Sequence, residues 1–232
     1  MPSRDIFCNS IDFNIYRINS IPSTNTYFKE NYNRYSDMSV LIANEQTNGR
    51  GRFTRQWESN NDICFSILFK EKHPNAIIAP LAIVSALNDL GISSGIKWPN
   101  DIYLDDKKLS GILIEEIYES SFVASVVGIG INIDDKPRYN GIGLAKYITT
   151  SKHKIIEIIL HHYKRLINIS MTDLIKLYKE NSIILNKKII YKEKIYLAID
   201  ITENGYLVLK DNHNNIITIS SDEINIKSAI ID

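Results

Sequence analysis

One short loop of the sequence gathers arginines between glycines. Glycine lets backbone N–H groups approach a ligand closely, and an arginine guanidinium binds phosphate or carboxylate oxygens through paired hydrogen bonds. A tryptophan at the end of the loop adds a flat surface on which a base can stack. The residues are Gln46, Gly49, Arg50, Gly51, Arg52, Arg55 and Trp57. Because the whole chain has 27 basic and 27 acidic residues, this local positive charge predicts a site for an anionic, nucleotide-bearing ligand; a solvated basic turn is the alternative.

A second segment combines charge with a rigid backbone. Pro99 fixes its own backbone and restricts the residue before it, so one turn presents Lys97, Asn100 and Asp101 together. A lysine can neutralise a polyphosphate, and a carboxylate beside a carboxamide can hold a magnesium ion or orient a phosphate. An ordinary Pro-Asn-Asp turn is the alternative.

Two strand-borne positions complete the candidate residues. Lys108 comes directly before an apolar strand in which Gly111 allows close backbone approach, so a small ligand could lie along this strand with the ammonium at its charged end. A hairpin with a surface lysine and a packing glycine is the alternative. Asn132 closes a glycine-rich apolar strand and is either a strand-end cap or a ligand contact.

Several common chemistries have no support in the sequence. No GxxxxGK[ST] phosphate loop and no serine nucleophile elbow occurs, and the run at 128–133 has Ile133 where a dinucleotide fingerprint needs its third glycine. His161 and His162 are adjacent rather than one helical turn apart, so solvated side chains are expected instead of a metal pair. Cys8 and Cys64 lie far apart, which favours small buried residues over a disulfide or zinc site.

The surrounding pattern predicts an α+β catalytic domain at residues 1–184, with a mixed β-sheet and flanking helices. Strands are expected at 13–18, 40–44, 63–69 (with one buried face), 95–98, 102–104, 108–117 and 122–133, and helices after residues 23–25, from 74 to a cap at 91, at 153–169 and at 171–184. Residues 45–61 are expected to form a polar loop. Short strands at 188–191, 195–201, 206–209 and 216–219 predict a small β-barrel at residues 185–232, docked on the larger domain.

Composition bounds the protein's surroundings. Zero net charge argues against general binding to nucleic acid. No apolar run approaches the roughly 18 residues that a membrane span needs, and residues 1–5 lack a signal-peptide layout. The protein is therefore expected to be cytoplasmic and not to associate with a membrane.

The motifs, in their order and spacing, resemble those of the biotin–protein ligases, also called biotin–[acetyl-CoA-carboxylase] ligases. The matching segments are Ser23-Thr24-Asn25, Gly-Arg-Gly-Arg-x-x-Arg-x-Trp at 49–57, the turn at 97–101, Lys-Leu-Ser-Gly-Ile-Leu-Ile-Glu at 108–115 and Gly-Ile-Gly-Ile-Asn at 128–132. Each motif alone is weak, and the five together are highly specific. The resemblance covers nearly the whole chain and implies that the C-terminal domain is SH3-like.

The resemblance implies an ATP-dependent reaction in two steps. Biotin and ATP, with Mg²⁺, form biotinyl-5′-AMP, and a lysine of a biotin carboxyl carrier domain then takes the biotinyl group. Both steps need charge and positioning more than a covalent nucleophile, which agrees with the missing triad.

The resemblance also implies residue roles. Ser23, Thr24, Asn25 and Gln46 would bind the biotin ring system, and Gly49, Arg50, Gly51 and Arg52 would close over the intermediate as a mobile flap, with both arginines near the acyl-phosphate. Lys108 would lie by the reacting carboxylate, which makes it catalytic together with Arg50 and Arg52, and Gly111 would leave room for biotin. Arg52, Arg55, Trp57, Lys97, Asn100, Asp101 and Asn132 would bind ATP or the adenylate, with Asp101 as a metal ligand.

Alternatives stay open at this point. A lipoate–protein ligase would use the same adenylation chemistry, and a non-catalytic module could retain the biotin pocket without turnover. Some members of the family carry an N-terminal DNA-binding domain of about 60 residues, whereas the Ser-Thr-Asn element here starts at residue 23; no binding to DNA is expected. The carrier protein is expected to belong to acetyl-CoA carboxylase or another biotin-dependent carboxylase, and a homodimer is an open option.

Overall fold

The computed structural model describes residues 2–4, 12–53, 55–59, 61–222 and 224–226. The prediction for Cys8 lies outside these residues. Cys64 is buried, as predicted. No described helix is both long and apolar enough to cross a membrane.

The large domain is built on one mixed sheet. Its strand order is β1-β2-β3-β6-β10-β9-β8-β7. The pair β2–β3 is parallel, and the other described pairs are antiparallel. The strands are β1 (Ser3–Arg4), β2 (Asn14–Ile21), β3 (Ser39–Gln46), β6 (Ile63–Phe69), β7 (Gly95–Lys97), β8 (Asp101–Leu104), β9 (Lys107–Tyr118) and β10 (Phe122–Ile131). The predicted α+β class and mixed sheet are confirmed.

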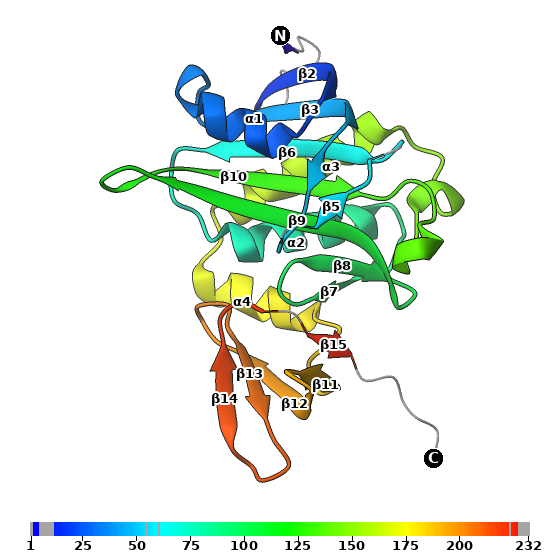
Figure 1. Ribbon diagram of the computed structural model, residues 1–232, viewed down its shortest axis with the longest axis vertical. Coiled ribbons are helices and arrows are strands. Elements are labelled where there is room, and N and C mark those ends of the chain that lie inside the picture. Colours follow the sequence, from blue (N-terminus) through cyan, green and yellow to red (C-terminus); the bar gives the residue numbers. More distant parts are fainter. Residues whose placement is uncertain (1, 5–11, 54, 60, 223, 227–232) are drawn as a thin grey trace.

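Helices cover both faces of this sheet (Figure 1). On one face, α1 (Thr24–Asn31) buries Phe28 against Leu41 and Leu68. On the other face, α2 (Asn75–Asp89) and α3 (Lys152–Leu166) pack on the main core, where Tyr163 stacks on Phe69. Strand β6 is therefore buried at every residue. The expectation of one buried face was wrong because this strand lies at the centre of a three-layer arrangement.

Local capping signals place the helix ends. Ser23 caps α1 by accepting a hydrogen bond from the backbone of Thr26, and Gly91 ends the segment after α2 with a φ of 77°, where glycine carries no steric penalty. The expected helix at 171–184 is shorter, because α4 (Met171–Glu180) gives way to residues that pair with β7. In that pairing the Ile183 N–H donates to the Ile96 carbonyl.

Two further details differ from the sequence pattern. The expected polar loop at 45–61 contains the end of β3 and a small hairpin of β4 (Gly49–Arg50) and β5 (Gln56–Trp57). His162 was expected to be solvated, but its imidazole bonds to Asp89 at 2.7 Å and its side chain is only 13% exposed. Short 3-10 helices complete the domain at η1 (Tyr32–Arg34), η2 (Pro137–Tyr139) and η3 (Leu144–Lys146).

The C-terminal residues form a separate antiparallel sheet in the order β14-β13-β12-β11-β15. Its strands are β11 (Lys188–Tyr191), β12 (Lys194–Ile201), β13 (Leu207–Lys210), β14 (Ile216–Ile219) and β15 (Asn225–Ile226). The small all-β unit was predicted, but β15 was not, and no described ladder joins β14 to β15 to close a barrel. The sheet docks on the large domain through a hydrogen bond from Trp98 Nε1 to the Gly205 carbonyl at 2.9 Å and an ion pair of Lys179 with Asp200 at 2.6 Å.

Candidate active site

A cavity opens between the β4–β5 hairpin, the start of α1, the turn at 97–101 and the surface of β9 and β10. It brings together most of the residues that the sequence singled out from distant segments. Those on its wall are Ser23, Thr24, Asn25, Gln46, Arg50, Gly51, Arg52, Arg55, Trp57, Lys97, Asn100, Asp101, Lys108 and Gly111. Gly49 and Asn132 are not on the wall.

One end of the cavity is a preorganised set of neutral polar groups. Gln46 Oε1 accepts hydrogen bonds from the Thr24 backbone N–H at 2.8 Å and from the Thr24 hydroxyl at 3.0 Å. Asn25 Nδ2 donates to the Leu113 carbonyl at 3.2 Å, and Asn25 Oδ1 lies 2.6 Å from Ser66 Oγ. These groups hold one another in place, so a ligand with ring N–H and C=O groups meets donors and acceptors that are already oriented.

Glycines on the sheet let side chains lie flat against it. A Cβ on Gly128 would stand 2.3 Å from Asn25 Oδ1, and a Cβ on Gly130 would stand 2.4 Å from the Trp57 ring. Gly111, opposite Gly130 on the neighbouring strand, would place a Cβ 3.0 Å from the same ring. The space over Gly111 therefore holds the Trp57 indole, whereas the resemblance implies that biotin lies there.

The other end of the cavity carries charge. Lys108 Nζ lies 2.7 Å from Asp101 Oδ1, and Lys97 Nζ donates to the Tyr103 hydroxyl at 3.1 Å. Arg52 donates to Asn100 Oδ1 at 2.8 Å. The ammonium of Lys108 and the guanidinium of Arg52 thus line one cavity and can neutralise an anion that enters it.

Asn132 acts behind the wall. Its carboxamide donates to the Lys108 carbonyl at 3.1 Å and the residue is buried. Of the two readings that the sequence left open, this geometry favours the structural one, since the contact fixes the backbone from which Lys108 projects.

Two wall residues, and one residue beside them, had no signal in the sequence. Asp222 and Ile224 reach the cavity from the connection between β14 and β15, and Ser221 beside them accepts a hydrogen bond from Arg52 at 2.7 Å. Nothing in the local sequence marks them, because they reach the cavity only through the docking of one sheet on another.

Glu115 is a further residue to which the sequence pattern assigned no role. Burial alone would raise the pKa of its carboxyl group, but hydrogen bonds from Lys29, Asn25 and Arg50 outweigh burial and lower this pKa. Glu115 is therefore an anion at neutral pH.

The cavity offers limited means of holding a metal ion. The described residues contain no group of three or more His, Cys, Asp or Glu side chains arranged for a metal, and the carboxylates on the wall are Asp101 and Asp222. Magnesium in nucleotide sites commonly uses one or two carboxylates together with substrate phosphates and water. The residues fit a magnesium ion that enters bound to the ATP phosphates. Asp101 would hold this ion, and its carboxylate would then be shared between the ion and the Lys108 ammonium.

Comparison with known protein families assigns the chain to a family. A model described as the biotin/lipoate A/B protein ligase family matches residues 17–132, half of the 232 residues. The chain belongs to this family. The matched range contains every wall residue named above except those from the C-terminal sheet.

Individual members of the biotin/lipoate ligase family are similar over the same region. The bifunctional ligase/repressor BirA of Bacillus subtilis is 37% identical over 115 residues, which are 45% of this chain and 35% of that protein. The biotin–[acetyl-CoA-carboxylase] ligase of Paracoccus denitrificans is 34% identical over 113 residues, 44% of this chain and 47% of that protein. The matched segment thus spans about a third to a half of these relatives.

Solved structures of family members share the fold over almost the full chain. The biotin protein ligase of Aquifex aeolicus, solved with biotin and ATP, aligns with a TM-score of 0.76 and 23% identity, over 93% of this chain and 99% of that one. The Helicobacter pylori biotin acetyl coenzyme A carboxylase synthetase aligns with a TM-score of 0.70 and 24% identity, over 88% and 98%. The likeness includes the small C-terminal sheet, so this two-part architecture is a property of the fold.

Proposed function

We propose that this chain is an ATP-dependent biotin–protein ligase. The observation that carries the proposal is one cavity that joins the neutral hydrogen-bonding set of Thr24, Asn25 and Gln46 to the cations Arg52 and Lys108. Such a cavity suits a ligand with a polar ring at one end and a carboxylate at the other. The names of relatives such as the Paracoccus denitrificans ligase support biotin as that ligand.

In the first step the biotin carboxylate oxygen attacks the α-phosphorus of ATP, and pyrophosphate leaves. The carboxylate is itself the nucleophile, so the chain has to bring two anions together. Lys108 and Arg52 neutralise the charge that the approach concentrates, and the polar set at Thr24 and Gln46 holds the ring at a fixed distance. Magnesium, when bound, would neutralise phosphate oxygens next to Asp101.

In the second step a lysine amine of a carrier domain attacks the acyl carbon of biotinyl-5′-AMP, forming an amide and releasing AMP. The chain needs no covalent nucleophile for this step. Cys64, the one described cysteine, is not suited to be a nucleophile, because burial raises the pKa of its thiol to about 12 and keeps the thiol protonated. We propose that the carrier is a biotin carboxyl carrier domain.

The wider setting follows from the same proposal. Residues 1–184 would form the catalytic domain and residues 185–232 a small β-domain that completes the cavity wall. The protein would act in the cytoplasm, where carrier domains and ATP are available, and a homodimer is the assembly to look for by sedimentation.

The deciding experiment incubates the protein with ATP, Mg²⁺ and labelled biotin or lipoate, with and without an isolated carrier domain. We expect labelled biotinyl-AMP without the carrier and label on the carrier lysine with it. Transfer of lipoate but not biotin would make the chain a lipoate ligase. Binding of biotin without pyrophosphate release would make it a non-catalytic module.

A further inference from the structure

Arg50 and Arg52 face different partners, although both were expected beside the reacting groups. Arg52 contacts Asn100 and Ser221 at the charged end of the cavity. Arg50 instead donates to Glu115 Oε1 at 2.8 Å and to Thr26 Oγ1 at 3.1 Å. Its charge is thus already engaged by protein groups at the opposite end of the cavity, beside the polar set of Thr24, Asn25 and Gln46.

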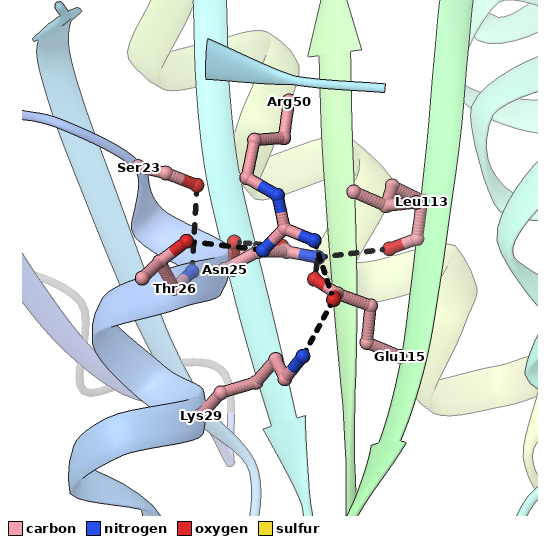
Figure 2. Close-up of polar contacts among 8 residues, drawn as sticks. Ser23, Asn25, Thr26, Lys29, Arg50, Leu113 and Glu115 are labelled. Atoms are coloured by element: carbon pink, nitrogen blue, oxygen red, sulfur yellow. Dashed lines mark hydrogen bonds and ion pairs between the residues drawn. The ribbon is translucent and has the colours of Figure 1, made fainter. Parts of the chain in front are cut away.

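Glu115 is the point at which three elements meet (Figure 2). The residue stands on β9 next to the wall residues Asn25 and Arg50, and its side chain is 13% exposed. Oε1 also accepts from Lys29 Nζ on α1 at 2.7 Å, and Oε2 accepts from Asn25 Nδ2 at 3.1 Å. One carboxylate therefore ties the β4–β5 hairpin and the first turns of α1 to the sheet.

The arrangement has a direct consequence for the cavity. Asn25 belongs to the neutral polar set, and Arg50 is the last residue of β4, which lies over that set. Because Glu115 bonds to both side chains, it sets how closely the hairpin approaches α1. Without the carboxylate, Arg50 would retain its hydrogen bond to the Thr26 hydroxyl as its remaining described side-chain contact.

We infer that Glu115 is a positioning residue, which holds the β4–β5 hairpin closed over the bound intermediate through Arg50. In this assignment, which rests on the proposed function, Arg50 is the residue through which the hairpin is held to the sheet. Arg52 and Lys108 supply the positive charge at the reacting atoms. The pair Glu115–Arg50 therefore controls how long biotinyl-AMP is retained, and has little effect on how tightly ATP binds.

The test starts from wild-type protein loaded with labelled biotinyl-AMP in the absence of a carrier. Failure of the wild type to form the adenylate would count against the proposed function and not against the positioning role of Glu115. With the adenylate formed, its loss is followed after a chase with excess unlabelled biotin. For Glu115→Gln we expect the adenylate to be lost faster by on the order of tenfold, which corresponds to about 1.4 kcal/mol, with an unchanged KM for ATP.

Controls separate positioning from general damage. Glu116→Gln changes the exposed neighbour on the same strand, which bonds to Tyr118, and is expected to release the adenylate at the wild-type rate. Arg50→Gln tests the same contact from the other residue. Because the Arg50 side chain is 41% exposed, this substitution is not expected to cause misfolding. Because both substitutions remove the same Arg50–Glu115 contact, the acceleration in the double variant should be clearly smaller than the product of the two single-variant accelerations.

Three results would overturn the inference. One is wild-type retention in both Glu115→Gln and Arg50→Gln. The second is additive acceleration in the double variant. The third is an equal rise in the KM values for biotin and ATP in Glu115→Gln, which would indicate loosening of the whole cavity.

Discussion

Lys108 and Asp101 illustrate what single side chains contribute to this site. They lie seven positions apart in the chain, on adjacent strands, and their charged atoms meet at 2.7 Å. The pair keeps the ammonium oriented toward the cavity before any ligand enters. An incoming carboxylate can then share the ammonium with Asp101, which costs less than desolvating a free lysine.

Replacement of Lys108 by alanine should therefore act on chemistry. We expect adenylate formation, measured as biotin-dependent pyrophosphate release, to slow by about 10²-fold, the usual effect of removing one charge-stabilising group. Lys107→Ala, at the exposed neighbouring position, serves as the control and should keep the wild-type rate. Equal rates in both variants would remove Lys108 from the reaction.

The lowered pKa of Glu115 predicts a pH effect on stability. A carboxyl group with a lower pKa in the folded than in the unfolded chain stabilises the fold above the unfolded value, about 4.3, and loses this contribution as the pH falls through the folded value. Wild-type protein should have a higher Tm than Glu115→Gln at pH 7, and the difference should shrink as the pH falls below about 4. A difference that does not change with pH would contradict this interpretation.

At the scale of elements, the β4–β5 hairpin and the glycine-lined strands work as a pair. Gly49 cannot carry a Cβ, which would stand 2.4 Å from the Trp57 carbonyl, so the hairpin closes tightly on itself. Gly130 in turn lets the indole of Trp57 rest on the sheet. The described contacts that hold the hairpin are thus largely made by side chains, among them Arg50, Arg52 and Trp57. The sheet beneath is joined by continuous strand pairing, so the hairpin should open more readily than the sheet.

Limited proteolysis can test this flap. Trypsin cleaves after arginine, and Arg52 and Arg55 lie in the turn between β4 and β5. We expect biotin plus ATP to slow cleavage there severalfold, because an ordered ligand beneath the hairpin keeps it closed. Cleavage within the C-terminal sheet, for example after Lys194, should not change. Equal cleavage near Arg52 with and without ligands would show that the hairpin is not a mobile flap.

At the scale of the whole molecule, the small C-terminal sheet completes the cavity. Arg52 spans from the hairpin to Ser221, while Trp98 in the 97–101 turn is fixed by the Gly205 carbonyl. Both contacts join the large domain to the five-stranded sheet. The position of the charged end therefore depends on how the two sheets dock.

Ser221→Ala should expose this dependence. Loss of the hydroxyl removes one partner of Arg52 and leaves the guanidinium less constrained. We therefore expect the KM for ATP to rise by about three- to tenfold, which corresponds to roughly 0.7 to 1.4 kcal/mol for one exposed hydrogen bond. The KM for biotin should change little, since the neutral polar set is untouched. Ser220→Ala is the matched control, and an equal effect of both substitutions would count against this role.

The sequence alone determined the features that depend on local chemistry. Turn residues and helix caps such as Ser23 and Gly91 placed the elements, because their effects are confined to a few neighbouring residues. The arginine–glycine loop, the Pro99 turn and Lys108 were recognisable because a site for anions needs those residue types close together in the chain. The family resemblance then joined these segments into one expected site.

Only the tertiary structure decided what these side chains contact. It separated Arg50, bound to Glu115, from Arg52, bound to Asn100 and Ser221, although the two arginines are almost adjacent in sequence. It also placed Asn132 behind the cavity wall. The physical reason is that a charged side chain takes whichever partner the packing of distant elements brings within 3 Å, and such long-range proximity leaves no trace in local residue patterns.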